Sequence, residues 1–159
     1  MKRKMLKLRI HHVFDIIRDF GSNKKFEKHI YGHSYHIVAN NIYEKKINKF
    51  KIVVSSDDIC KNCIKLVNNK CIDSILHRKD FNKKEAFNNY LDNRIMEVLN
   101  LREYETMSLE ELSKISNKYI DNIEYIYKGN DENHTQERKK NVVKGIKKIK
   151  KELHNNQLE

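Results

Sequence analysis

The sequence predicts an α+β protein that is mostly helical and carries a small sheet. Residues 6–10 and 50–54 have the alternating or β-rich composition of short strands, whereas the longer segments repeat apolar residues at the spacing of amphipathic helices. The chain has 159 residues, of which 38% are hydrophobic, so it can form one modest core. We therefore expect a single metal-binding domain over residues 1–159, for the reasons given below.

The first half of the chain is predicted to alternate between strands and helices. Residues 6–10 alternate apolar and charged side chains, as a half-buried strand does, and residues 11–20 then follow helical spacing up to Gly21. A second helix is expected over residues 33–46, and the next strand over residues 50–54. A strand, helices and a strand in this order favour a two-stranded, parallel sheet with a right-handed crossover.

The second half is predicted to be helical. Residues 84–99 form one amphipathic helix, and Ser108 with Glu111 makes a capping box that opens another, which should run to about residue 128. Gly129 ends that helix. Residues 131–154 form a last helix, which is basic on one side and carries an apolar stripe on the other.

The three cysteines of the chain all lie in one short segment, at positions 60, 63 and 71. A Cys-x-x-Cys pair directs two sulfur atoms at one ion, and a tight turn at Asn68 and Asn69 would bring Cys71 back to it. Polar neighbours make burial as free thiols unfavourable, and an odd number of cysteines argues against a disulfide framework. We expect a metal knuckle at the edge of the sheet, because strand 50–54 leads into Cys60.

Three thiolates leave a zinc ion or an iron–sulfur cluster one ligand short. His11, His12 and Asp15 are candidates for this position, because they lie on one face where a strand changes into a helix. Each could instead orient another ligand by accepting or donating a hydrogen bond. The alternative without a metal is a helix start with ordinary His–Asp pairing.

An open fourth position would let the metal act as a Lewis acid. Proton transfer would then fall to His33, His36 or Asp58, which are the catalytic candidates in this sequence. The alternative is that at least one histidine of the cluster His29, His33 and His36 simply lies on the surface.

Four segments in the same order resemble the prokaryotic family called domain of unknown function 1284. They are residues 8–15, with His11, His12 and Asp15; residues 31–38; residues 57–63 with the later Cys71; and residues 92–101. The resemblance covers about residues 6–128 and implies an iron–sulfur protein. It also implies that Asp15 faces the cysteines as the fourth ligand, because the family usually has cysteine there. A second cysteine group near the C-terminus, which many members carry, is missing from residues 115–145.

The composition limits the kinds of partner that the protein is expected to bind. A net charge of +11 would attract nucleic acid, so the alternative function is a zinc-stabilised nucleic-acid-binding module that uses the basic helix 131–154. Packing explains that helix better, because its apolar stripe continues over several turns and its basic run lacks aromatic residues for stacking. No segment has the length of a membrane span or the apolar core of a secretion signal, so we expect a cytoplasmic protein with no membrane partner. The substrate or redox partner is not predicted.

Overall fold

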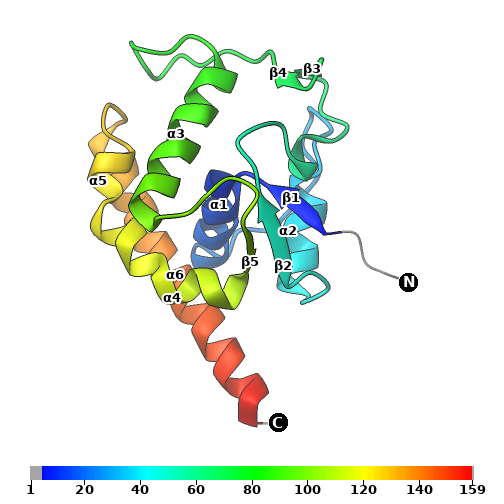
Figure 1. Cartoon of the computed structure of the whole chain (residues 1–159), viewed down its shortest axis with the longest axis vertical. Helices are drawn as coiled ribbons and strands as arrows, with labels where there is room; N and C mark the ends of the chain where they lie inside the picture. Colours follow the sequence, from blue (N-terminus) through cyan, green and yellow to red (C-terminus); the bar gives the residue numbers. More distant parts are fainter. Residues whose placement is uncertain (1–4, 159) are drawn as a thin grey trace.

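The structure is a computed structural model that describes residues 5–158, and it is α+β and mostly helical (Figure 1). Its elements follow in the order β1 (Leu6–Leu8), α1 (Ile10–Gly21), α2 (Tyr35–Tyr43), β2 (Lys49–Ile52), the 3-10 turn η1 (Asp58–Cys60), β3 (Leu66–Val67), β4 (Lys70–Cys71), α3 (Lys84–Leu99), β5 (Thr106–Ser108), α4 (Leu109–Asp121), α5 (Ile123–Ile126) and α6 (Glu132–Leu158).

The main sheet has the strand order β1-β2-β5. β1 and β2 are parallel, with Leu6 opposite Phe50, and β5 is antiparallel to β2, with Met107 opposite Phe50. The expectation of a two-stranded sheet is therefore wrong. β5 has three residues, which is too short for an alternating pattern to be recognised in the sequence. A separate two-stranded hairpin, β3-β4, lies in the cysteine segment.

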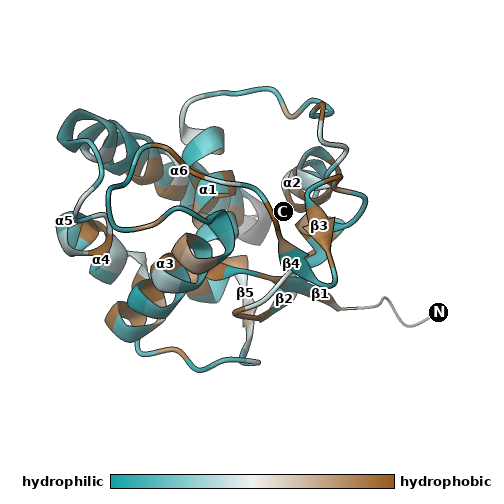
Figure 2. Cartoon of the chain, turned by 90° about the horizontal axis from the view of Figure 1, so that it is seen from above, coloured by the Kyte–Doolittle hydropathy of each residue, from teal (hydrophilic) through white to brown (hydrophobic). Residues whose placement is uncertain are grey.

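Helix α1 lies in the middle of the protein, between the sheet, α3 and α6 (Figure 2). Its apolar side chains are almost completely inaccessible to solvent, which requires neighbours on several sides (Ile10, Val13, Phe14, Ile16 and Ile17). The crossing with α6 is unusually close. A methyl group added at Gly145 of α6 would lie 2.0 Å from the Ile17 carbonyl oxygen, and one added at Gly21 would lie 1.8 Å from the Asn141 carbonyl oxygen.

Helix α6 is held on α1 by its apolar stripe, in which Val142, Ile146 and Ile149 are buried. Lys148 adds a hydrogen bond of 2.7 Å from its Nζ to the Phe20 carbonyl oxygen. Asp131 begins the helix, since its Oδ1 accepts a hydrogen bond from the His134 backbone at 3.0 Å. The basic helix is thus a packing element of the core.

The capping box at the start of α4 is confirmed on one side, because Ser108 Oγ accepts a hydrogen bond from the Glu111 backbone. The single helix expected up to residue 128 is interrupted at Asn122, whose side chain donates to the Lys118 carbonyl oxygen at 2.8 Å. Such a local side-chain bond competes with helix continuation. The chain resumes as the short α5 before Gly129.

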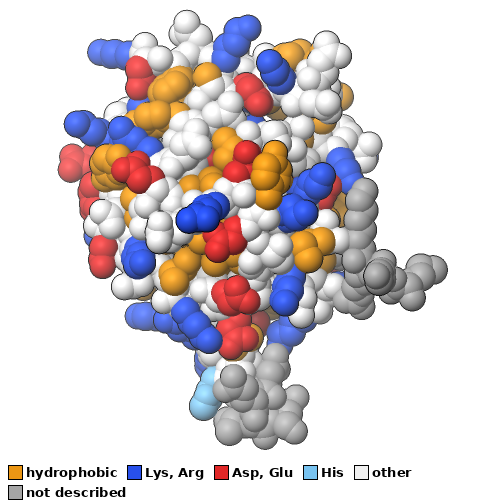
Figure 3. Space-filling model, in the orientation of Figure 1, with side chains coloured by type: hydrophobic (Ala, Val, Ile, Leu, Met, Phe, Trp, Pro, Cys, Tyr) orange, Lys and Arg blue, Asp and Glu red, His pale blue; other side chains and the backbone are white. Residues whose placement is uncertain are grey.

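Charge on the molecular surface is mixed. On the face shown in Figure 3, blue basic and red acidic side chains are interspersed and do not form one broad basic patch. Within residues 5–158 there is no helix with the length and apolar character needed to cross a bilayer.

Candidate functional site

A cavity of about 450 Å³ lies between α1, the loop that joins α1 to α2, the cysteine segment and the start of α3. Most of the predicted site residues line it, although they are separated by up to 59 positions in the sequence (His12, Asp15, His33, Cys60, Cys63 and Cys71). The fold therefore brings the three cysteines, two of the predicted histidines and Asp15 to the same cavity.

The Cys-x-x-Cys segment forms a tight turn. The Cys63 backbone donates to the Cys60 carbonyl oxygen at 3.1 Å, and Asn62 has the positive φ of 66° that the third position of a type II turn requires. The α1–α2 loop packs against this turn at Gly32, where an added methyl group would approach the Asn62 carbonyl oxygen to 2.9 Å. Gly32 thus permits the close approach of the two segments.

The β3-β4 hairpin returns the chain to the cavity. Asn68 and Asn69 both have positive φ values, of 50° and 64°, as in the two-residue turn predicted there. Cys71 lies opposite Leu66 in the hairpin, and its backbone donates to Glu85 Oε2 of α3 at 2.9 Å. The hairpin is thereby attached to the start of α3.

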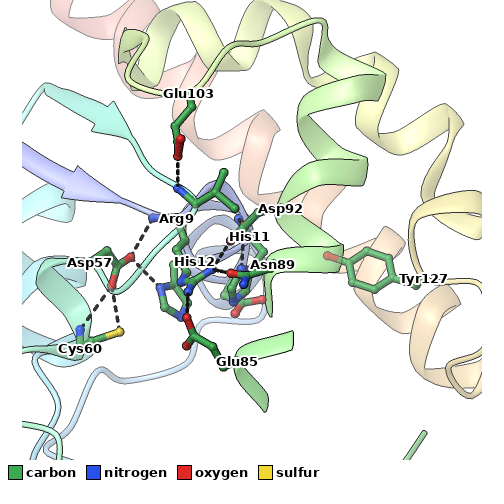
Figure 4. A network of polar contacts seen from close by, with 12 residues as sticks. Arg9, His11, His12, Asp57, Cys60, Glu85, Asn89, Asp92, Glu103 and Tyr127 are labelled. Atoms are coloured by element: carbon green, nitrogen blue, oxygen red, sulfur yellow. Dashed lines mark hydrogen bonds and ion pairs between the residues drawn. The ribbon is translucent and has the colours of Figure 1, made fainter. Parts of the chain in front are cut away.

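Asp57 connects His12 to the cysteine segment (Figure 4). Its Oδ2 lies 2.7 Å from His12 Nδ1 and also accepts from the Arg9 backbone at 2.8 Å. Its Oδ1 accepts from the backbone of Ile59 and Cys60 and from Cys60 Sγ at 3.3 Å. One completely buried carboxylate thus holds both a candidate imidazole ligand and a candidate thiol.

These contacts shift three pKa values. Burial opposes ionisation of Asp57, but His12 and the donated hydrogen bonds outweigh burial and lower the pKa of Asp57 to about 2. Burial also opposes the charged form of His12, but the attraction of the Asp57 carboxylate outweighs the effect of burial. The pKa of His12 is therefore raised. Burial and the charge of Asp57 raise the pKa of the Cys60 thiol to about 12. At neutral pH Asp57 is therefore an aspartate and Cys60 a thiol, and the Asp57 contact holds the His12 ring through Nδ1 and favours its protonated form.

His11 takes part in a second carboxylate–histidine pair. Its Nδ1 and its backbone nitrogen lie 2.7 and 2.9 Å from Asp92 Oδ1, and Asp92 Oδ2 accepts from Arg9 Nη1 at 2.9 Å. Arg9 is almost fully buried and also contacts Glu85 and Asn89 (Figure 4). His11 lines a different cavity, of about 820 Å³, which shares Asp15 with the first.

Asp15 is engaged with basic side chains. Its Oδ1 accepts from Arg138 Nη1 of α6 at 2.7 Å and lies 3.4 Å from Arg18 Nη1. Burial opposes its ionisation, but Arg138 and Arg18 outweigh burial and hold the pKa of Asp15 far below its ordinary range. Asp15 thus faces the cavity with the cysteines while one of its oxygens is occupied by an ion pair.

The three predicted proton-transfer residues do not lie together. His33 lines the cavity with the cysteines, and burial and the neighbouring His29 lower its pKa. His36 lies outside the lining of this cavity, on α2, and its buried Nδ1 has no hydrogen-bond partner within the described chain. Asp58 does not line this cavity; it accepts a hydrogen bond from the Lys7 backbone and pairs with Lys61.

The cysteines are free thiols that are partly accessible to solvent. Across the described range 5–158, no three His, Cys, Asp or Glu side chains are grouped closely enough to hold a metal ion. The metal knuckle therefore stays a prediction.

Sequence reasoning missed the residues that orient the histidines, Asp57 and Asp92, and the arginines that neutralise the buried carboxylates, Arg9 and Arg138. Asp57 could have been found from its position directly before the η1 turn, where an aspartate side chain commonly accepts hydrogen bonds from the backbone of the turn. The other three carry no local signal, because their hydrogen-bond partners lie 76 or more positions away.

The model of the family described as protein of unknown function (DUF1284) matches residues 24–128. The searches of curated proteins and of solved structures found no match. The match covers more than half of the chain and includes all three cysteines, His33 and Asp57, so the chain belongs to the DUF1284 family of proteins of unknown function.

Proposed function

We propose that this is a metal-binding protein in which Cys60, Cys63 and Cys71 hold a zinc ion together with His12 Nε2. The observation that carries the proposal is that Asp57 contacts both His12 Nδ1 and Cys60 at the cavity that the other two cysteines line. A zinc-bound histidine commonly donates its second ring nitrogen to a carboxylate, which fixes the tautomer and points the free nitrogen at the metal.

The donor set supports zinc over a cluster. Three thiolates and one imidazole are a common tetrahedral zinc shell, whereas an iron–sulfur cubane usually takes four thiolates and this chain has three cysteines. An iron–sulfur cluster held by the same cysteines is the alternative, and metal analysis separates the two.

His12 is favoured over Asp15 and His11 as the fourth ligand for a geometric reason. The Asp57 contact leaves His12 Nε2 available, whereas Asp15 would have to leave Arg138, with which it forms a 2.7 Å ion pair. His11 lines the neighbouring cavity and not the one with the cysteines. Binding still requires the thiols to turn toward His12, because these side chains are not yet grouped around one point.

Such a movement is compatible with the chemistry of Cys60. Its thiol must lose a proton to bind zinc, and the nearby Asp57 carboxylate disfavours a thiolate in the absence of a cation. A divalent ion at this position would compensate both negative charges. If one coordination position then exchanges with water, His33 is the proton-transfer group in the same cavity.

The test is metal analysis of protein purified without air, together with its visible absorption spectrum. We expect a colourless protein with about one zinc per chain. Cys63→Ser and Cys71→Ser should lose the metal, and His12→Gln should weaken binding about 10-fold or more. Brown protein with iron and sulfide would select the cluster.

His36→Gln is the matched control for His12→Gln, because His36 lies outside the cavity lining. It should keep the metal content of the unaltered protein. Full metal content in both cysteine variants would overturn the proposal, and so would equal losses in the two histidine variants. An Asp15→Asn variant that loses zinc while His12→Gln retains it would transfer the fourth position to Asp15.

A further inference from the structure

The cavity that holds the cysteines also has a surplus of positive charge. Its buried and half-buried carboxylates all have basic partners: Asp15 and Asp19 pair with Arg18, Glu85 with Arg9 and Asp73 with Lys65. Four lysines on the same lining, Lys24, Lys25, Lys28 and Lys84, have no carboxylate partner in the described part of the chain. The one lining carboxylate without a basic partner there is Glu27.

Lys84 differs from the other three lysines. It is half-buried and contributes to the walls of both cavities, whereas Lys24, Lys25 and Lys28 are exposed at the mouth. A lysine that loses part of its hydration without gaining an anion destabilises the folded protein. Its position is explained if an anion from solution binds beside it.

Arg9 provides an independent observation. Only 1% of its surface is accessible, it lines the same cavity, and its Nε is a buried donor without a hydrogen-bond partner. The other guanidinium nitrogens contact Glu85, Asn89 and Asp92. A buried donor left unsatisfied costs about 1–3 kcal/mol, so such groups usually mark a position where a water molecule or a ligand supplies an acceptor.

We infer that this cavity binds a small molecule bearing a carboxylate or phosphate group, with its anionic oxygens toward Lys84 and the Arg9 side of the cavity. The exposed lysines at the mouth would attract such a molecule by their long-range field. The inference goes beyond the metal proposal and does not depend on it, because neither Lys84 nor Arg9 is a proposed metal ligand.

The cavity size limits the class of ligand. A volume of about 450 Å³ accommodates a small metabolite and is within the usual range for small-molecule pockets. Carboxylate and phosphate groups both accept hydrogen bonds from lysine and arginine, and phosphate offers more oxygens. The two sources are therefore compared directly in the experiment.

The experiment is a titration of the purified protein with inorganic phosphate and, separately, with malonate, followed by nuclear magnetic resonance at constant ionic strength. The Arg9 Nε–H and the Lys84 backbone amide report on the site. We expect saturable shifts of both signals with at least one of the two anions. Lys84→Met should weaken that binding about tenfold, the effect of one charged hydrogen bond.

Lys144→Met is the matched control, because it removes the same charge from an exposed position of α6 that does not line the cavity. It should bind the anion as the unaltered protein does. Equal weakening in the two variants would mean nonspecific attraction and would overturn the inference, as would shifts that never saturate with either anion. The titration is repeated with chelator, and binding that disappears after metal removal would assign the anion to the metal and refute the Lys84 site.

Discussion

Replacing Asp57 by asparagine should remove a large part of the stability of the cysteine segment. The carboxylate receives five hydrogen bonds, from the backbone of Arg9, Ile59 and Cys60, from His12 Nδ1 and from Cys60 Sγ. An amide has one acceptor oxygen, so several of these buried donors would lose their partner. The side-chain shape is otherwise conserved, which makes the change a test of charge and hydrogen bonding.

The magnitude follows from the pKa shift of Asp57. A decrease from 3.8 to about 2 corresponds to roughly 2 kcal/mol in favour of the folded state when the carboxylate is charged. Lost acceptors add to this, so the free energy of unfolding should fall by about 3 kcal/mol at pH 6. Because the folded pKa is depressed, the carboxylate contribution is complete above about pH 4 and is lost as the pH falls toward 2.

His12 gives the opposite dependence. Its folded pKa is raised, so its contribution is complete below its ordinary value of 6.5 and is lost as the pH rises through the folded value. The pair therefore stabilises the protein most between about pH 4 and pH 6.5.

The assay is urea unfolding of metal-free protein, with chelator present, at pH 3, 4, 6 and 8. Asp58→Asn is the control, since Asp58 pairs with the exposed Lys61 and the amide would keep an acceptor oxygen for the Lys7 backbone, so the change should cost no more than about 1 kcal/mol. The reasoning is refuted if the two variants lose equal stability at pH 6, or if the difference between unaltered protein and Asp57→Asn is the same at pH 3 as at pH 6.

Three further changes test the core around α1. Asp15→Asn leaves Arg138 partly buried without a counter-ion and should cost about 2–3 kcal/mol in urea unfolding, which the additional change Arg138→Met should partly restore; no recovery would contradict the pairing. Gly145→Ala should lower the melting temperature despite the better helix propensity of alanine, because the methyl group would lie 2.0 Å from the Ile17 carbonyl oxygen. Truncation after Gly129 should remove the cover of α1 and abolish cooperative melting measured by circular dichroism, so a truncated chain that melts cooperatively at an unchanged temperature would disprove the packing role of α6.

Helices with a long periodic pattern were predictable from the sequence. Residues 84–99 coincide with α3, and the Ser108 cap forms as expected, because side-chain periodicity and capping depend on neighbours a few positions away. β5 and the interruption at Asn122 were missed. The three-residue strand β5 is stabilised by pairing with β2, which lies more than 50 positions earlier in the sequence. The strand propensity of the three residues alone cannot reveal such a distant partner.

The candidate site was predictable in its residue types and not in its contacts. Cysteine spacing indicated a turn, and the turn is present. Asp15, however, pairs with Arg138, 123 positions away, and His11 pairs with Asp92, 81 positions away. The sequence contains many lysines and aspartates that could form such pairs, so the actual partners are decided by how the helices pack.

The crossing of α1 and α6 has a consequence for synthesis of the protein. α1 leaves the ribosome early, whereas the glycine-bearing side of α6 that covers it follows more than 110 residues later. At ordinary elongation rates this delay is roughly 6–20 seconds. During that time the side of α1 that packs on α6 stays uncovered, so the nascent chain exposes apolar surface that favours aggregation or chaperone binding. The core is complete only when Gly145 reaches Ile17.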